Sequence, residues 1–222
     1  MTSRWLPLES NPEVMNKYVR ALGMPSTFEF VDVWGLDFEL LLMVPRPVTA
    51  VMLLYPLTDK CESQPLGSEA PGDGVYFMKQ TIGNACGTIA LIHALCNNKE
   101  KLGFDPSKHL SKFLGDTEAM SPEERGKHLE EDSAFGVAHE ESAQEGQTKA
   151  PSRDDKVDLH FIAFVEKDGG LYELDGRKNA PIRHGDTTAD NLLEDAAKVV
   201  KKFMARDPDN VNFTVVALAK AG

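Results

Sequence analysis

The sequence predicts an α/β fold of the mixed α+β kind, in which helices flank a central, mainly antiparallel sheet. Three observations lead to this class. Short apolar or β-branched runs recur among helical patterns, they do not alternate regularly with those patterns, and an Asp-Gly turn joins two of them as a hairpin. The 222 residues suffice for one domain with a substantial core, and we expect residues 1–222 to form a single domain.

Four helices outside the candidate active site are predicted from their start signals, stop signals and apolar periodicity. Asn11 can cap the first helix, and Gly23 ends it. Two more follow Asp105-Pro106 and Ser121-Pro122, the second with Glu124 in position for a capping box. The last helix follows Thr188. Its apolar face is formed by Leu192, Ala196, Val199 and Phe203, and its charged face by Lys198, Lys201 and Lys202.

Two polar stretches are predicted to be loops, and six short runs are predicted to be strands. The loops are Thr58–Gly74 and Ala138–Lys156, and the second is long enough to be a lid or a binding loop. The predicted strands are Phe28–Trp34, Val48–Tyr55, Val75–Met78, Leu159–Val165, Leu171–Leu174 and Phe213–Ala219.

Composition argues against several classes of protein. A formal net charge of -11 argues against a nucleic-acid partner and favours a basic one, although the acidic excess is equally explained by solubility. No apolar run reaches the length of a membrane span, and the first residues lack a signal-peptide pattern, so we expect a cytoplasmic or nuclear protein without membrane contact. Three cysteines without a CxxC pair indicate reduced thiols and no zinc site.

Cys86 is the strongest candidate for a reactive group. It lies in QTIGNACGTIALIHAL, from Gln80 to Leu95, and precedes a run that is apolar on most sides and therefore predicts a buried helix. Backbone N–H groups and the helix dipole at this amino terminus favour a thiolate. The alternative is an inert buried thiol, an interpretation that suits Cys96; Cys61 lies in a polar loop without a partner nearby in sequence.

A cysteine nucleophile requires a base, and His160 is the best candidate. His93 shares the helix of Cys86, but seven residues separate the two, or roughly 10 Å along the axis, so His93 is too far away to be the base. The remaining histidines lie in polar segments where we expect exposed side chains; they are His109, His128, His139 and His184.

A hairpin argument pairs His160 with a carboxylate. If Asp168-Gly169 forms the turn, Lys167 pairs with Gly170, and counting outward pairs His160 with Arg177. Asp175 then lies on the same face, either one diagonal away or directly opposite, depending on the loop register. Its carboxylate can orient the imidazole and stabilise the imidazolium. The alternative is a strand-end histidine satisfied by its neighbours, and contact with Cys86 is not predicted by this argument.

Gln80 supplies a fourth candidate group. It lies six residues before Cys86, where its side-chain amide and the Cys86 backbone N–H can donate hydrogen bonds to a developing oxyanion. Papain-like proteases also place a glutamine six residues before their cysteine. The spacing alone is weak support, because glutamines are common.

These residues and several further stretches resemble the short single-domain branch of the ubiquitin carboxyl-terminal hydrolases. The stretch from Gln80 to Leu95 is similar to the active-site signature of that family, and VDLHFIAFVEKDGGLYELDGRK is similar to the segment with its histidine and aspartate. The other similar stretches, in order, are RWLPLESNPEV, FVDVWGLD, MVPRPVTAVMLLYP, SPEERGKHLE, HEESAQEGQT and KKFMARDPD.

The resemblance implies a fold, an activity and a mechanism. The fold is papain-like, with a knotted backbone, and about residues 138–156 form a crossover loop that arches over the active site and limits the size of what can leave. The activity is hydrolysis of amide, ester or thioester bonds at the carboxyl-terminal glycine of ubiquitin, through an acyl-enzyme intermediate and without a cofactor. The implied triad is Cys86, His160 and Asp175, with Gln80 as the oxyanion donor.

The resemblance also implies a monomer that binds ubiquitin, or a ubiquitin-like modifier, through three segments. Acidic neighbours for the basic ubiquitin tail are Glu9, Glu140, Glu141 and Glu145. The three segments comprise Pro7, Leu8, Glu9, Ser10, Asn11 and Pro12; Ala143, Gln144, Glu145, Gly146, Gln147, Thr148, Lys149 and Ala150; and Asn210, Val211, Asn212, Phe213, Thr214 and Val215.

The chain departs from the family pattern in two places, and two rival functions are consistent with the sequence. The signature usually ends in a small serine or alanine where this chain has Cys96, and the loop Thr58–Gly74 is individual in length and composition. One rival is a protein that binds or stabilises ubiquitin and in which catalysis is incidental. The other is a papain-like protease that acts on unfolded peptides.

Overall fold

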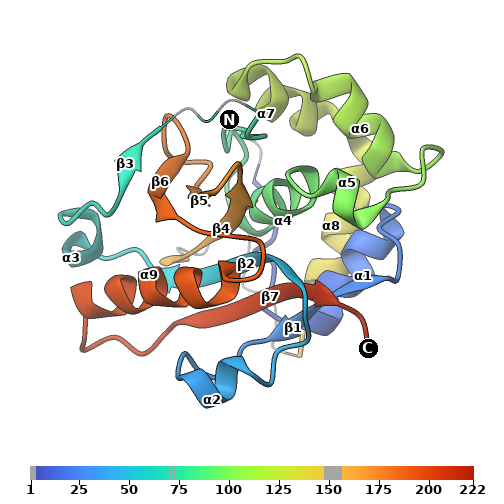
Figure 1. The fold of residues 1–222 in the computed structure, drawn as a ribbon. Coiled ribbons are helices and arrows are strands. Elements are labelled where there is room, and N and C mark those ends of the chain that lie inside the picture. The colour runs from blue at the N-terminus through green and yellow to red at the C-terminus, as the bar shows by residue number, and fades with distance from the viewer. Residues whose placement is uncertain (1–3, 71, 73, 148–156) are drawn as a thin grey trace.

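The computed structural model describes residues 4–70, 72, 74–147 and 157–222 and contains a seven-stranded sheet in which every paired strand is antiparallel (Figure 1). The spatial order is β1-β7-β2-β4-β5-β6-β3. The predicted fold class is therefore confirmed. The strands are β1 (Phe28–Asp32), β2 (Val48–Pro56), β3 (Ser68–Glu69), β4 (Leu159–Lys167), β5 (Gly170–Leu174), β6 (Ile182–Asp186) and β7 (Thr214–Lys220).

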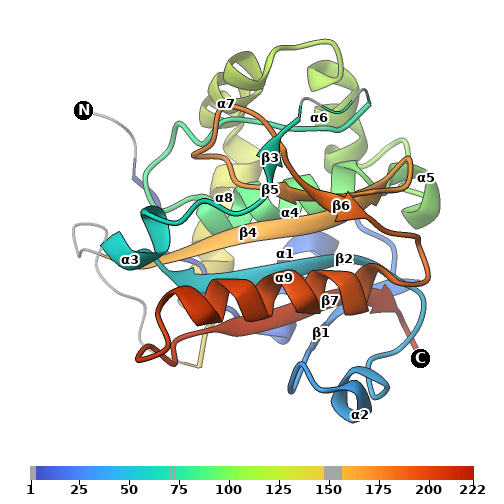
Figure 2. The ribbon, with the colours of Figure 1, turned by 60° about the vertical axis from the view of Figure 1, so that its left-hand side comes forward.

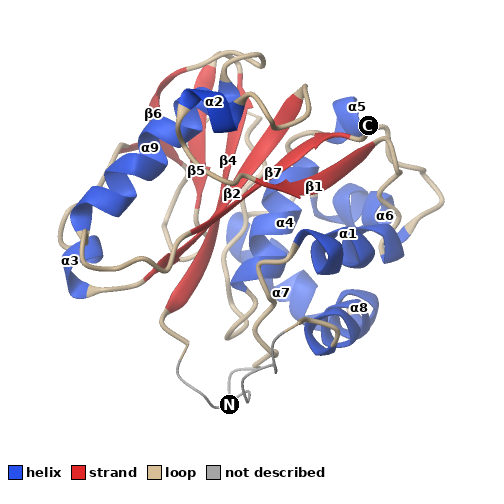
Figure 3. Ribbon diagram, turned by 90° about the horizontal axis from the view of Figure 1, so that it is seen from below, coloured by secondary structure: helices blue, strands red, loops and turns tan. Residues whose placement is uncertain are grey.

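Helices cover both faces of this sheet. In Figures 2 and 3, α9 crosses one face of the sheet. Helix α4 packs on the other face, on the same side as α1, α7 and α8. The helices in the described residues are α1 (Pro12–Ala21), α2 (Phe38–Leu41), α3 (Asp59–Glu62), α4 (Cys86–Cys96), α5 (Lys99–Leu102), α6 (His109–Thr117), α7 (Pro122–Glu131), α8 (Ser133–Gln144) and α9 (Leu192–Arg206). None of these helices is long and apolar enough to cross a bilayer.

The core consists of two apolar clusters separated by the sheet. One cluster joins α9 to alternate residues of β2, β4 and β7, such as Leu53 and Ile162. The other joins the opposite residues of those strands to α1, α4, α6 and α8. Every residue of α4 after Cys86 is buried, as its apolar sequence predicts. Burial on all sides fixes this helix in position, and with it the location of Cys86 at its amino-terminal end.

The boundaries of α1 and α7 follow the predicted caps, whereas α6 begins at His109, three residues after Pro106, without a side-chain cap. Asn11 accepts a hydrogen bond from the Glu13 backbone N–H at the start of α1, and Gly23 has a φ of 107° just after its end. Ser121 and Glu124 form the predicted capping box at the start of α7. The predicted apolar face of α9 is buried, and its lysine face is exposed.

The predicted strand Val75–Met78 is wrong. This segment is extended, but it joins no ladder in the described structure, because its N–H groups bond to side chains and loop carbonyls. Val75 N donates to the Gly72 carbonyl at 3.1 Å, Tyr76 N to Asn97 Oδ1 at 2.8 Å, and Met78 N to His93 Nε2 at 3.0 Å. Strands β6 and β3 were not predicted; they are short and polar and lie at one edge of the sheet.

The predicted loop Ala138–Lys156 is wrong in its first part. Residues 138–144 belong to α8, which buries Phe135, Ala138, His139, Ser142 and Ala143 on one face. Small and polar residues occupy most of that face, so the helical period escaped an analysis based on large apolar residues. The rest of the predicted crossover loop lies mainly in residues 148–156, outside the described residues.

The α7 cap gives a direct test of local stability. Ser121→Ala removes the side chain that accepts from the Glu124 backbone N–H at 3.3 Å, and we expect the free energy of unfolding to fall by about 1 kcal/mol. Ser121→Asp preserves an acceptor and should remain close to the unmodified protein. Urea denaturation followed by circular dichroism measures both, and equal losses for the two variants would exclude a capping role.

Candidate active site

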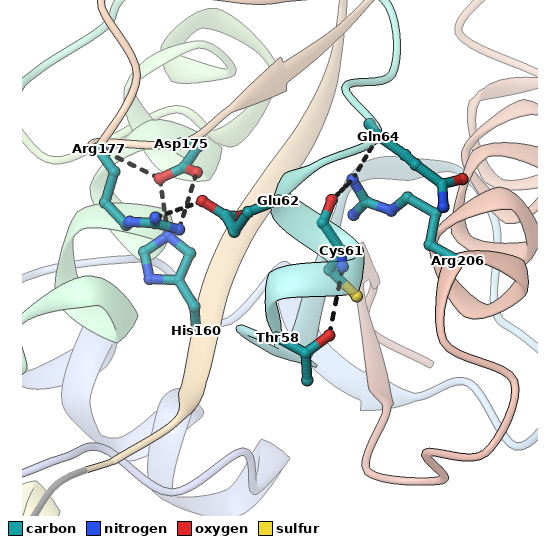
Figure 4. Close-up of polar contacts among 8 residues, drawn as sticks. All are labelled: Thr58, Cys61, Glu62, Gln64, His160, Asp175, Arg177 and Arg206. Carbon is teal, nitrogen blue, oxygen red and sulfur yellow. Dashed lines mark hydrogen bonds and ion pairs between the residues drawn. The ribbon is translucent and has the colours of Figure 1, made fainter.

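Three elements place Cys86, His160 and Asp175. Cys86 is the first residue of α4, His160 is the second residue of β4, and Asp175 follows the last residue of β5. His160 Nε2 lies 2.7 Å from Asp175 Oδ1, and both side chains are almost fully buried. Figure 4 shows the imidazole beneath the carboxylate. The contact between histidine and carboxylate that the hairpin argument predicts is therefore present.

The hairpin has the predicted turn but a different end. Asp168 and Gly169 both have positive φ, as a two-residue turn requires, and Lys167 pairs with Gly170. The ladder stops at Ala163 and Leu174, so the predicted pairing of His160 with Arg177 is wrong. Asp175 leaves the sheet and turns its side chain back toward His160.

Asp175 is held by groups beyond the histidine. The Arg177 backbone N–H donates to its Oδ1 at 2.9 Å, and the Arg177 guanidinium lies 4.0 Å from its Oδ2. That guanidinium also donates to Glu62 of α3 at 2.7 Å (Figure 4). Sequence reasoning missed Arg177 and Glu62 as supports of the site, because their link depends on the path of the loop before α3.

The electrostatics favour a thiolate–imidazolium pair. Burial acts to raise the pKa of Cys86, but a hydrogen bond with His160, the charge of that ring and the Phe161 and Gly87 N–H groups lower it below the ordinary thiol value. For His160, burial opposes the charged form, yet its bonds to Asp175 and Cys86 raise the pKa to about 9. Since Nε2 faces Asp175, Nδ1 is the nitrogen left for the sulfur.

The carboxylate is the third member of this charge arrangement. Burial alone would raise the pKa of Asp175, but the hydrogen bond and charge of His160, with the Arg177 N–H and guanidinium, lower it. Asp175 is thus ionised near neutral pH, and an ionised carboxylate stabilises the imidazolium form of His160.

The other two cysteines lie in the core. Cys96, at the carboxyl end of α4, is 4% exposed, and burial raises its pKa to about 12, as expected for an inert thiol. Cys61 is fully buried in α3, so its predicted place in a polar loop is wrong. Thr58 caps that helix by accepting from the Cys61 N–H, and the Cys61 carbonyl accepts from Arg206 at 2.6 Å (Figure 4).

The prediction of exposed side chains is wrong for all four remaining histidines, since two are buried and His109 and His128 are half-buried. His93 is fully buried on α4, where burial lowers its pKa to about 4 and its Nε2 accepts from Met78. His139 and His184, which were expected to be exposed, have buried side chains; His184 lies 2.7 Å from Glu173. His109 is only partly exposed and lies 2.8 Å from Asp132. Polar neighbours in sequence do not reveal that a ring is enclosed by distant elements.

Gln80 lies beside the Asp175 turn. Its backbone N–H donates to the Gly176 carbonyl at 2.9 Å, and its side-chain amide donates to the Ile82 carbonyl at 3.1 Å. A Cβ on Gly176 would lie 3.0 Å from both the Gln80 nitrogen and its Cβ, so glycine permits this approach. One amide hydrogen anchors the side chain, and the second is available to a further acceptor.

A cavity of about 190 Å³ opens at Cys86. Two of the predicted ubiquitin-binding segments contribute to its walls: Pro7, Leu8, Glu9 and Ser10 from the first, and Ala143 from the second. The remaining walls are Leu54, Val157, Leu159 and Phe161. A larger cavity, of about 460 Å³, lies at the other end of α4 and contains none of the four candidate catalytic residues.

The predicted binding segments differ in their surroundings. Asn11 and Pro12 begin α1, and Gly146 lies so close to the Glu9 carboxylate that a Cβ there would collide with it. In the third segment, Val211 is 86% exposed, whereas Val215 is buried in β7. Thr148, Lys149 and Ala150 lie outside the described residues. In the described part of the chain, no cluster of three or more His, Cys, Asp or Glu residues could hold a metal ion.

Comparisons with known proteins agree on one family. Residues 5–205 match the family "Ubiquitin carboxyl-terminal hydrolase, family 1". A ubiquitin carboxyl-terminal hydrolase of Aplysia californica is 58% identical over 209 residues, which cover 93% of this chain and 97% of the relative. The human isozyme L1 is 49% identical over 221 residues, which cover 97% of this chain and 98% of the relative.

Solved structures extend the agreement to three dimensions. The Trichinella spiralis UCH37 catalytic domain, solved with ubiquitin vinyl methyl ester bound, matches with a TM-score of 0.81 and 25% identity, covering 99% of this chain and 97% of that one. The chain therefore belongs to the ubiquitin carboxyl-terminal hydrolase family and is a cysteine-type ubiquitin hydrolase.

Proposed function

We propose that Cys86, His160 and Asp175 form the catalytic triad of this hydrolase and that Gln80 supplies an oxyanion donor. The buried 2.7 Å contact between His160 and Asp175, together with the lowered pKa of Cys86, carries the proposal. An imidazolium held by a carboxylate and bonded to a sulfur at a helix amino terminus is the environment that activates a thiol.

The reaction proceeds through an acyl enzyme. The Cys86 thiolate attacks the carbonyl carbon of the terminal glycine, and the electron pair of the carbonyl double bond moves to oxygen. The Gln80 amide and the Cys86 backbone N–H donate to that oxyanion. The intermediate then collapses to a thioester, while the proton on His160 Nδ1 passes to the leaving amine, alcohol or thiol.

Water completes the cycle. His160, now neutral, accepts a proton from the water that attacks the thioester carbonyl, and the second tetrahedral intermediate expels the Cys86 thiolate. The products are ubiquitin with a free carboxylate and the separated leaving group. Asp175 keeps its charge throughout and stabilises the imidazolium each time it forms.

The proposed substrate is ubiquitin, or a ubiquitin-like modifier, with an adduct on its carboxyl-terminal glycine. The cavity at Cys86 and its walls from residues 7–10 and Ala143 support a site for a narrow peptide tail. Glu9 contributes a carboxylate to the cavity wall and favours a basic tail, whereas Glu145 on the second segment is paired with Lys17 at 2.5 Å. We assign the third contact surface to Asn210–Val215, whose exposed Val211 offers an apolar contact.

Removal of the Cys86 sulfur nucleophile tests the assignment. We expect Cys86→Ser to lower turnover of a ubiquitin amide substrate by a factor of about 10⁴ or more, because the hydroxyl is a far weaker nucleophile. Ubiquitin binding, measured by calorimetry, should persist. Cys61→Ser and Cys96→Ser serve as controls. Ubiquitin vinyl methyl ester should label Cys86, and wild-type turnover by Cys86→Ser or labelling at another cysteine would contradict the mechanism.

Asp175→Asn tests the charge arrangement through pH dependence. His160 has a raised pKa of about 9, so the imidazolium is lost, and kcat/KM falls, as pH rises through that value. Without the carboxylate charge, this alkaline midpoint should move to lower pH by about one unit or more. Asp186→Asn, at an exposed carboxylate on β6, is the matched control. An unchanged alkaline midpoint in Asp175→Asn would contradict the role of Asp175.

Gln80→Ala tests the oxyanion donor. We expect kcat to fall by about 10²–10³ with little change in KM, because the lost hydrogen bond forms in the transition state. Alkylation of Cys86 by iodoacetamide, which forms no oxyanion, should keep its rate. Gln64→Ala, at an exposed side chain, is the matched control. Equal losses in turnover and alkylation would show that Gln80 acts on the thiolate instead.

A further inference from the structure

His139 has a buried position that the proposed mechanism does not use. Its side chain comes from the middle of α8 and is only 1% exposed. Both ring nitrogens have partners: Nδ1 lies 2.8 Å from Thr88 Oγ1, and Nε2 lies 2.6 Å from the Leu6 carbonyl oxygen. The Trp5 ring packs against the imidazole, with ring centroids 4.5 Å apart. One side chain thus joins α8, α4 and the amino-terminal segment.

The partners define the direction of each hydrogen bond for a neutral ring. A carbonyl oxygen only accepts, so Nε2 donates to Leu6. The ring then has no hydrogen on Nδ1, which must accept from the Thr88 hydroxyl. Thr88 Oγ1 in turn accepts from the Tyr18 hydroxyl, 3.0 Å away. The result is a continuous buried chain of donors from α1 through α4 to α8 and on to the Leu6 carbonyl.

This chain ends beside the candidate active site. Thr88 lies two residues after Cys86, and Leu6 directly precedes the residues 7–10 that line the cavity. Ala143, on the same face of α8 as His139 and one turn later, lines the cavity as well. Residues 7–10 therefore form one wall of the cavity, and α8 contributes Ala143 to another. Loss of the hydrogen bond to the Leu6 carbonyl would detach the first wall from α8.

The opposite edge of the amino-terminal segment is held by the loop before Cys86. Trp5 N donates to the Gly83 carbonyl at 2.9 Å, and the Asn84 side chain donates to the Trp5 carbonyl at 3.1 Å. A Cβ on Gly87 would lie 3.0 Å from Leu8 Cβ, so the segment also packs on the first turn of α4. These contacts fix the segment against α4, whereas His139 fixes it against α8.

We propose that His139 is a positioning residue that sets the width of the cavity at Cys86 by anchoring the Leu6 carbonyl to α8. The proposal rests on the proposed function, in which residues 7–10 bind the ubiquitin tail. His160 and Asp175 come from β4 and the end of β5, so loss of the anchor leaves their contact in place. The effect belongs to substrate binding and should appear in KM with little change in kcat.

Two amide variants separate the two bonds of the ring. His139→Gln carries an amide near the position of Nε2 and can still donate to Leu6, whereas His139→Asn reaches only the position of Nδ1 and can still contact Thr88. We expect His139→Asn to raise KM for a ubiquitin substrate about tenfold, with kcat within about twofold. His139→Gln should restore KM to within about twofold of the unmodified protein. His128→Asn, at a half-buried ring on α7, controls for the substitution itself.

A fluorescence measurement reports on the anchor without catalysis. The chain has two tryptophans, and Trp34 is 75% exposed, so Trp34→Phe leaves Trp5 as the single reporter. In that background, His139→Asn should shift Trp5 emission to longer wavelength as the ring gains contact with water, and His139→Gln should not. Thermal unfolding by circular dichroism establishes that each variant is folded.

The combined outcomes distinguish the two levels of inference. A higher KM and a shifted emission in His139→Asn, both reversed in His139→Gln, support the proposal. An unshifted emission in His139→Asn, or a shifted emission with an unchanged KM, overturns the proposal about His139. In either case, turnover of this variant at the wild-type rate leaves the proposed function intact. If Cys86→Ser retains turnover, the proposed function fails, and the emission of Trp5 still decides whether His139 anchors the segment.

Discussion

The buried contact between His160 and Asp175 is the constraint on which the candidate site depends. Asp175 is fully buried, and a carboxylate in such a place must be compensated by charge and hydrogen bonds. His160 and Arg177 provide that compensation, so the end of β5 has to turn back over β4. On the other side of the imidazole, α4 presents Cys86 because its remaining residues are enclosed by apolar neighbours. The charge compensation of Asp175 and the apolar packing of α4 therefore both act on the position of His160.

Local signals in the sequence were sufficient for much of this arrangement. The apolar run after Cys86 predicted a buried helix and a thiol at its start, and the Asp168-Gly169 turn brought His160 and Asp175 to the same side of a hairpin. Each inference depends on residues close together in the chain, where helix period, caps and turn geometry operate. The contact of Cys86 with His160 joins distant segments and lay beyond such reasoning.

The errors have a common physical origin. Residues 75–78 have the composition of a strand, but N–H groups of this segment donate to the side chains of Asn97 and His93 and not to a neighbouring strand. His139 lies among glutamates and alanines, so its polar surroundings in sequence concealed a ring enclosed by Trp5, Tyr18 and Thr88. In both cases the deciding partner is remote in sequence and polar, and apolar periodicity does not register such partners. The support that Arg177 and Glu62 give to the site was not predicted for the same reason.

Helix α4 has a cysteine at each end, and this has a consequence for oxidation. Cys86 has a lowered pKa at the amino-terminal end, whereas burial raises the pKa of Cys96 at the other. Ten residues of helix separate the two thiols by about 15 Å, well beyond the span of a disulfide. Peroxide should therefore convert Cys86 to a sulfenic acid that Cys96 cannot capture. A small external thiol that enters the cavity beside residues 7–10 can then reduce the oxidised enzyme.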